Sequence, residues 1–151
     1  MKKILFVCLG NICRSPMAEA MMRHIVTQAG KADNFEIASA AVSEEEWGNP
    51  IYPQAARILR THGIPYDAVR TARQMKADDY DRYDLIIGMD EANLSAIRRI
   101  AGGDPQHKVH LLMDYAGSHR SVADPWYTRD FETAYDDILT GCRALCDQLG
   151  L

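Results

Sequence analysis

Short apolar runs alternate with amphipathic stretches along this chain. Buried strands are predicted at four apolar runs, residues 3–7, 35–40, 84–89 and 109–113. Helices are predicted where apolar positions recur at three- and four-residue steps, at residues 16–29, 54–62, 91–100 and 131–149. Strands that alternate with helices form a parallel sheet covered on both faces. We therefore predict an α/β fold, a single domain over residues 1–151 with a doubly wound, flavodoxin-like sheet of four parallel strands.

The composition is that of a globular domain and excludes several classes of function. Of the 151 residues, 47% are hydrophobic and 25% are charged, which suffices for a sizeable core. The net charge of −4, without a basic stripe, argues against a nucleic-acid partner. The acidic run Glu44-Glu45-Glu46 is most simply a solvated loop.

The N-terminus and the cysteines bear on the compartment. No apolar run approaches the length of a membrane span, so we expect no membrane insertion. Lys2 and Lys3 precede an apolar stretch, as in a secretory signal, but this stretch ends by Leu9 and is too short. We expect a cytoplasmic protein, in which the four cysteines should be free thiols.

The segment from Cys8 to Ser15 lies between the first predicted strand and the first predicted helix. The start of a helix presents unpartnered backbone N–H groups and the positive end of the helix dipole, which together make an anion site. A short loop here can curl so that successive amides face one centre. Gly10 and Asn11 tolerate left-handed backbone, and Arg14 adds a planar fork for two oxygens. We therefore predict a site for a phosphate-like oxyanion, formed by Leu9, Gly10, Asn11, Ile12, Cys13, Arg14 and Ser15.

Cys8 would lie at the bottom of this site, where the donors that favour an oxyanion also favour a thiolate. A hydrogen bond from Ser15 would favour the thiolate further. The predicted reaction is an in-line attack of the sulfur on phosphorus, which gives a phosphocysteine intermediate. Fixed donors should supply most of the rate gain, so no metal or other cofactor is expected.

A leaving oxygen needs a proton, and Asp124 is the candidate donor. As a carboxylate it would then activate the water that hydrolyses the intermediate. Trp126 and Tyr127 supply flat apolar walls that suit an aromatic leaving group. Ligands of open α/β sheets bind beyond the carboxyl ends of the strands, so Cys8, Asp90 and Asp124 should share one rim.

Each of these residues also has a simpler structural interpretation. Cys8 alone could be an inert buried thiol, and an Asp-Pro pair such as the one at Asp124 is usually turn chemistry. Cys142 and Cys146 lie one helical turn apart on an apolar face, which indicates core packing rather than a metal site. Cys13 is either a small packed residue or the partner of Cys8 in a reversible disulfide formed on oxidation. The simpler interpretations explain each residue singly but not their order in the segment.

The segment 8–15, followed by Pro-Met-Ala-Glu at 16–19, resembles the low-molecular-weight protein tyrosine phosphatases. Further blocks follow in family order at residues 71–74, 89–94 and 124–127. The resemblance implies hydrolysis of phosphotyrosine in proteins. The implied partners are tyrosine-phosphorylated proteins, with phosphate and other oxyanions as competitive ligands.

The resemblance also assigns roles to individual residues. It implies Cys8 as nucleophile, Arg14 as phosphate clamp and Asp124 as general acid. Asn11 and Ser15 are the implied loop supports, with Asp90 in the network beneath them.

The chain departs from the family pattern at several places, two of which bear on the site. Arg70 stands where many members have His, so this part of the support network should be wired differently. The family often places an aromatic residue at about Glu45, and Trp47 is the nearby candidate to line the cleft.

Relatives on this fold include arsenate reductases and arginine phosphatases, which keep the same loop. Thiol-coupled arsenate reduction needs further cysteines between the third strand and the next, and none lies between Cys13 and Cys142. Members that resemble arginine phosphatases tend to carry Thr where Ile12 stands, which favours tyrosine. A thiol redox enzyme and a non-catalytic phosphopeptide-binding module stay open as alternatives.

Overall fold

A parallel sheet runs through the protein, for which the computed structural model describes all residues from 1 to 151. Its strand order is β2-β1-β3-β4. The four strands are β1 (Lys2–Cys8), β2 (Phe35–Ala41), β3 (Leu85–Gly88) and β4 (Val109–Leu111). In the register, Val7 of the central strand β1 lies opposite Ala40 of β2 and Gly88 of β3. The predicted four-stranded parallel sheet is confirmed.

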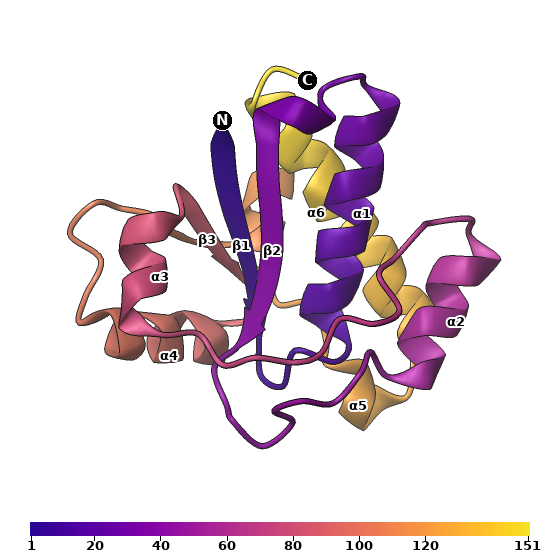
Figure 1. Cartoon of the computed structure of the whole chain (residues 1–151), viewed down its shortest axis with the longest axis horizontal. Helices are drawn as coiled ribbons and strands as arrows, with labels where there is room; N and C mark the ends of the chain where they lie inside the picture. The colour runs from indigo at the N-terminus through magenta and orange to yellow at the C-terminus, as the bar shows by residue number, and fades with distance from the viewer.

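Helices cover both faces of this sheet, as the alternating pattern predicts. The α-helices are α1 (Arg14–Gln28), α2 (Pro53–Thr61), α3 (Ala77–Arg82), α4 (Glu91–Ala101), α5 (Pro125–Thr128) and α6 (Phe131–Gln148), and the 3-10 helices are η1 (Ala32–Asn34) and η2 (Leu112–Ala116). Figure 1 shows α1 and α6 on one side of the sheet and α3 and α4 on the other. No helix combines the length and the hydropathy that crossing a bilayer requires.

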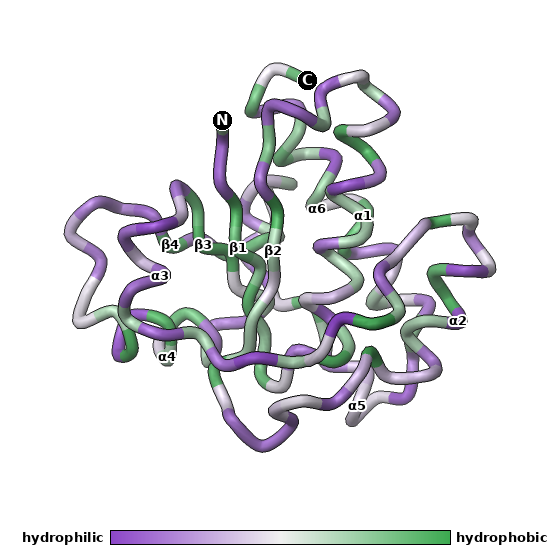
Figure 2. The backbone as a smooth tube through the Cα atoms, viewed as in Figure 1, coloured by the Kyte–Doolittle hydropathy of each residue, from purple (hydrophilic) through white to green (hydrophobic).

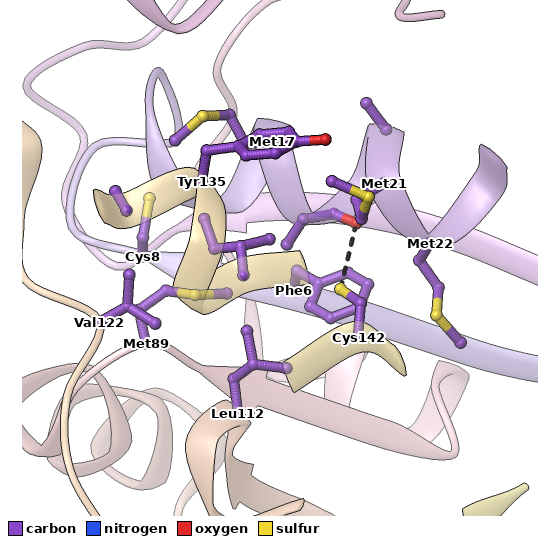
Figure 3. Close-up of a cluster of buried hydrophobic side chains, with 14 of the residues drawn as sticks. Phe6, Cys8, Met17, Met21, Met22, Met89, Leu112, Val122, Tyr135 and Cys142 are labelled. Atoms are coloured by element: carbon purple, nitrogen blue, oxygen red, sulfur yellow. Dashed lines mark hydrogen bonds between the residues drawn. The ribbon is translucent and has the colours of Figure 1, made fainter. Parts of the chain in front are cut away.

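The strands are buried on both faces because successive side chains alternate between two cores. Ile4, Phe6 and Cys8 belong to the larger core, whereas Leu5 and Val7 belong to the smaller one. Figure 2 shows the resulting hydrophobic tracts of the strands in the middle of the molecule. Figure 3 shows the larger core, with Cys8, Met89 and Val122 gathered at one end of the cluster. Cys8 therefore lies at one end of the larger apolar core.

Several predicted boundaries differ from the structure. α3 and α5 were not predicted, because helices of six and four residues are too short to show a periodic pattern. β4 ends at Leu111, and the apolar run continues into the 3-10 helix η2, in which Leu112 and Met113 are buried. An apolar run alone does not distinguish a strand from a buried turn.

The carboxyl ends of the strands define one end of the molecule. In Figure 1, β1 and β2 point toward the bottom of the view, where the connection from β1 to α1 and the short helix α5 lie. Asp90 follows β3 directly and begins α4. The predicted rim is therefore assembled from segments that are far apart in the sequence.

Candidate active site

Residues 8–15, here called the Cys8 loop, curl around the sulfur of Cys8. The backbone N–H groups of Asn11 and Ser15 donate to Cys8 Sγ at N···S distances of 3.3 and 3.4 Å, and Ser15 Oγ lies 3.1 Å from the same sulfur. Asn11 permits the tight curl, because its φ of 59° is left-handed, a region that asparagine tolerates better than most residues. Donors aimed at one sulfur stabilise negative charge on it. The Cys8 loop is therefore suited to hold a thiolate.

The other amides of the Cys8 loop are available to an anion. Their N–H groups donate to no atom of the protein, and they belong to Leu9, Gly10, Ile12, Cys13 and Arg14. α1 begins at Arg14, earlier than the predicted residue 16, and Cys13 provides no side-chain cap. Unpartnered N–H groups in a curled loop at the start of a helix form a concave anion site, to which the helix dipole adds. The loop can thus bind several oxygens of one tetrahedral oxyanion.

Arg14 is almost completely buried beside these amides, with 2% of its surface exposed. Its Nη1 donates to Asp90 Oδ2 at 2.8 Å and to the carbonyl of Val122 at 2.9 Å, and Nη2 lies 3.3 Å from Asp124 Oδ2. Burial alone would lower the pKa of this guanidinium, but the negative charges of Cys8 and Asp124 and the hydrogen bond to Asp90 outweigh it and raise the pKa. Arg14 is therefore a permanent cation in a defined position.

The two carboxylates that face Arg14 are each anchored at a helix start. Asp90 Oδ1 accepts from Asn93 N at 2.7 Å at the start of α4. Asp124 Oδ1 accepts from Trp126 N at 3.0 Å at the start of α5. In both residues the second oxygen points to the guanidinium. Asp124 thus lies at the edge of the anion site with its orientation set by a helix cap.

The side chain of Asn11 is completely buried and uses all its hydrogen-bonding groups. Its Nδ2 donates to Ser15 Oγ at 2.8 Å and to Ser39 Oγ at 2.9 Å. Its Oδ1 accepts from Arg70 Nη2 at 2.5 Å and from Arg73 N at 3.2 Å. We predicted Asn11 and Ser15 as supports but missed Ser39 and Arg73, which lie 28 and 62 residues from Asn11 in the chain. No local sequence pattern marks such distant partners.

Replacing Arg70 with alanine is expected to lower kcat/KM for an aryl phosphate about tenfold, the cost of one buried hydrogen bond. The reason is that Asn11 Oδ1 loses one of its two donors, so the left-handed loop conformation is held less firmly. Steady-state kinetics check this, and Arg70→His should restore part of the loss because imidazole can donate to the same oxygen. Arg82→Ala, which removes an exposed arginine paired with Glu36, is the control and should leave kcat/KM unchanged. Wild-type kinetics in Arg70→Ala would contradict this positioning role.

A cleft of about 180 Å³ opens at the Cys8 loop. Its lining combines that loop with α5 and with the connection from β2 to α2, through Cys8, Leu9, Gly10, Ile12, Cys13, Arg14, Ser43, Glu45, Glu46, Asp124, Trp126 and Tyr127.

Trp47 does not line this cleft, contrary to our expectation. Its side chain is 57% exposed, and the ammonium of Lys76 lies 5.7 Å from the centroid of its ring. A turn closed by a hydrogen bond from Trp47 N to the carbonyl of Glu44 precedes it. This turn leaves Glu45 and Glu46 in the lining. The acidic run is thus part of the cleft wall and not only a solvated loop.

Cys13 lines the same cleft but differs chemically from Cys8. Burial and the nearby charges of Cys8 and Asp124 raise the pKa of Cys13 to about 12. Cys13 is therefore a neutral thiol at physiological pH. Cys142 and Cys146 are buried in the larger core, which confirms their predicted packing role. No three side chains of His, Cys, Asp or Glu are grouped so as to hold a metal ion.

The chain is similar to known proteins over almost its whole length. The sequence model of the family described as low molecular weight phosphotyrosine protein phosphatase matches residues 3–150. The low molecular weight protein-tyrosine-phosphatase YfkJ of Bacillus subtilis is 40% identical over 147 residues, which cover 96% of this chain and 94% of YfkJ. The low molecular weight phosphotyrosine protein phosphatase of Homo sapiens is 40% identical over 152 residues, which cover 97% of this chain and 95% of that protein.

Solved structures show the same likeness. The crystal structure of YfkJ matches this chain with a TM-score of 0.94 at 40% identity and covers 99% of this chain and 94% of YfkJ. The crystal structure of DARP, a Drosophila arginine phosphatase, matches with a TM-score of 0.89 at 29% identity and covers 100% of this chain and 99% of DARP. Both the TM-score and the identity are higher for YfkJ.

Proposed function

From its membership of the low molecular weight phosphotyrosine protein phosphatase family, whose members are enzymes of that class, we propose a reaction for this chain. The chain hydrolyses phosphotyrosine in proteins through a phosphocysteine intermediate. The observation that carries the proposal is the convergence of two backbone N–H groups and one hydroxyl on Cys8 Sγ, next to five unpartnered amides of the same loop. A site that stabilises an anionic sulfur and a bound oxyanion together fits a nucleophile that attacks a phosphate ester.

In the first proposed step, the Cys8 thiolate attacks phosphorus in line with the phenolic oxygen. The S–P bond forms as the bond from phosphorus to that oxygen breaks. Asp124, as a carboxylic acid, gives its proton to the leaving oxygen, so tyrosine departs as a neutral phenol. The position of the Asp124 carboxyl beside Arg14 supports this role, because it lies at the edge of the anion site.

In the second step, water attacks the phosphocysteine. The Asp124 carboxylate takes a proton from this water, the S–P bond breaks, and the Cys8 thiolate is regenerated as inorganic phosphate forms. The same carboxyl group thus serves first as acid and then as base. Inorganic phosphate, the product, resembles the phosphoryl group of the substrate in charge and shape, so it should compete with substrate for the site.

The Cys8 loop and Arg14 supply the charge stabilisation in both steps. In phosphoryl transfer, negative charge is spread over the three equatorial oxygens of phosphorus in the transition state. The unpartnered loop amides and the guanidinium are already in place, so they need little reorganisation during the reaction. In this proposal no metal ion takes part.

The aromatic residues of α5 support tyrosine as the phosphorylated residue. Trp126 and Tyr127 line the cleft and are 43% and 73% exposed, so their rings are accessible to a substrate. Trp126 is held by an edge-to-face contact with Tyr52, with ring centroids 5.0 Å apart. Aromatic pairs contribute about 0.5–1.5 kcal/mol beyond the area that they bury. An aryl phosphate therefore gains contacts that an alkyl phosphate lacks.

The test compares hydrolysis of one peptide carrying phosphotyrosine, phosphoserine or phosphoarginine, with and without a chelator. We expect kcat/KM for phosphotyrosine to exceed the other two by about tenfold or more, the equivalent of one or two aromatic contacts. The chelator should leave the rate unchanged, and inorganic phosphate should inhibit competitively. Faster hydrolysis of phosphoarginine would replace the proposed substrate, and loss of activity with the chelator would contradict the metal-independent mechanism.

The cysteines concern three further points: the compartment, a reversible disulfide and the arsenate reductase alternative. We propose a reducing, cytoplasmic compartment, in which the four cysteines would stay free thiols. A reversible disulfide between Cys8 and Cys13, which share the cleft lining, stays a prediction. Thiol-coupled arsenate reduction is not favoured, because Cys142 and Cys146 are buried on the face of α6 that packs into the larger core.

A further inference from the structure

Two carboxylates form one wall of the active-site cleft. Glu45 and Glu46, here called the acidic wall, belong to the connection between β2 and α2. This connection is bonded to the Cys8 loop, since Val42 N donates to the carbonyl of Cys8 and Ser43 N to that of Leu9, both at 3.0 Å. The acidic wall is therefore fixed next to the phosphate site and is not a free surface loop.

Local contacts hold the two residues in place. Glu46 Oε2 accepts from Asn49 Nδ2 at 2.6 Å. The Cγ of Glu46 lies 3.2 Å from the position that a Cβ would take at Gly10, so its side chain packs directly on the Cys8 loop. Glu45 N donates to Ser43 Oγ at 3.1 Å, and its own side chain is exposed. One carboxylate is thus anchored and the other reaches toward solvent.

The protein itself does not neutralise the acidic wall. Neither carboxylate forms an ion pair with a Lys, Arg or His side chain. Arg14 is the one basic residue in the cleft lining, and it is already paired with Asp90 and Asp124. Arg129 packs against the opposite, aromatic wall, with its guanidinium carbon 5.9 Å from the centroid of Trp126, and forms no ion pair with Glu45 or Glu46.

Unpaired carboxylates beside a phosphate site oppose binding of a dianion unless the substrate brings its own positive charge. We infer that the acidic wall selects phosphotyrosine sites flanked by Lys or Arg within about three residues, the reach of an extended chain across such a cleft. The inference rests on the proposed function and names its substrate class. A flanking cation both pairs with Glu45 or Glu46 and screens their repulsion of the phosphate.

The experiment uses three phosphotyrosine peptides of equal length whose flanking residues are Lys, Ala or Glu. We expect kcat/KM to fall in that order, with about a tenfold ratio between the Lys and Glu peptides at low salt, the sum of a few exposed charge pairs. The ratio should shrink in about 0.5 M salt, because exposed charges are screened. In E45Q/E46Q the ratio should drop below about threefold, as those pairs are lost.

E44Q is the matched control, because Glu44 belongs to the same acidic run but does not line the cleft. It should keep most of the wild-type ratio. Equal kcat/KM on all three peptides, or an undiminished ratio in E45Q/E46Q, overturns the inference and leaves the proposed function standing. Absence of turnover on every phosphotyrosine peptide removes the proposed function itself, so the two failures are distinguishable.

Discussion

Replacing Cys8 with serine is expected to reduce turnover of an aryl phosphate by at least about 10⁴-fold, as for loss of a covalent nucleophile. The donors around Cys8 Sγ would still be present, but a serine hydroxyl is not ionised at neutral pH and is a poor nucleophile. Affinity for inorganic phosphate should change by less than about tenfold, since the unpartnered amides and Arg14 are untouched. Steady-state kinetics and phosphate-binding calorimetry measure the two effects.

Cys13→Ser is the matched control for Cys8→Ser. It makes the same change in the same loop, at a thiol that burial and the charges of Cys8 and Asp124 keep protonated by raising its pKa to about 12. We expect it to retain turnover within about tenfold of the wild type, because Cys13 contributes its backbone amide and not its sulfur. Turnover in Cys8→Ser that stays near the Cys13→Ser level would refute the phosphocysteine mechanism.

Replacing Asp124 with asparagine should slow substrates with poor leaving groups far more than those with good ones. For phenyl phosphate or phosphotyrosine we expect kcat to fall about 10²–10³-fold, the usual contribution of a general acid. For a nitrophenyl phosphate the loss should be below about tenfold, since a stabilised phenolate needs little protonation. Asparagine is chosen because it also caps helices well, so α5 should keep its start at residue 124.

Asp130→Asn makes the same chemical change at another helix cap, where Asp130 accepts from Thr133 N at the start of α6. It lies outside the cleft lining and should leave kcat unchanged for both leaving groups. A leaving-group series that gives parallel losses for Asp124→Asn would assign Asp124 to binding and remove it as the acid.

Most of the fold could be predicted from the sequence because its signals are local. The apolar runs of β1 and β3 and the three- and four-residue steps of α6 are visible within one window of the chain. The sequence did not predict α3 and α5, because a helix of one or two turns shows no periodic pattern. The predicted fourth strand ran two residues past the end of β4, because buried strands and buried turns have the same composition.

The parts of the site that the sequence predicts are also the local ones. The Cys8 loop and the candidate acid are recognisable because each is a short run of residues with distinctive chemistry. The partners of Asn11 and the content of the cleft wall are not, since Ser39, Arg70 and Arg73 meet Asn11 only after distant segments have folded together. Trp47 and Glu45 differ by two positions, yet only Glu45 lines the cleft.

The order of residues along the chain thus determined the alternation of strands and helices and placed a cysteine, a curled loop and an arginine at the start of a helix. These follow from neighbours in sequence, whose geometry the backbone limits to a few conformations. Only the tertiary structure decided which buried groups hold Asn11 and which charges surround the phosphate site. Those contacts depend on the packing of elements and on the direction of each side chain, which no local pattern encodes.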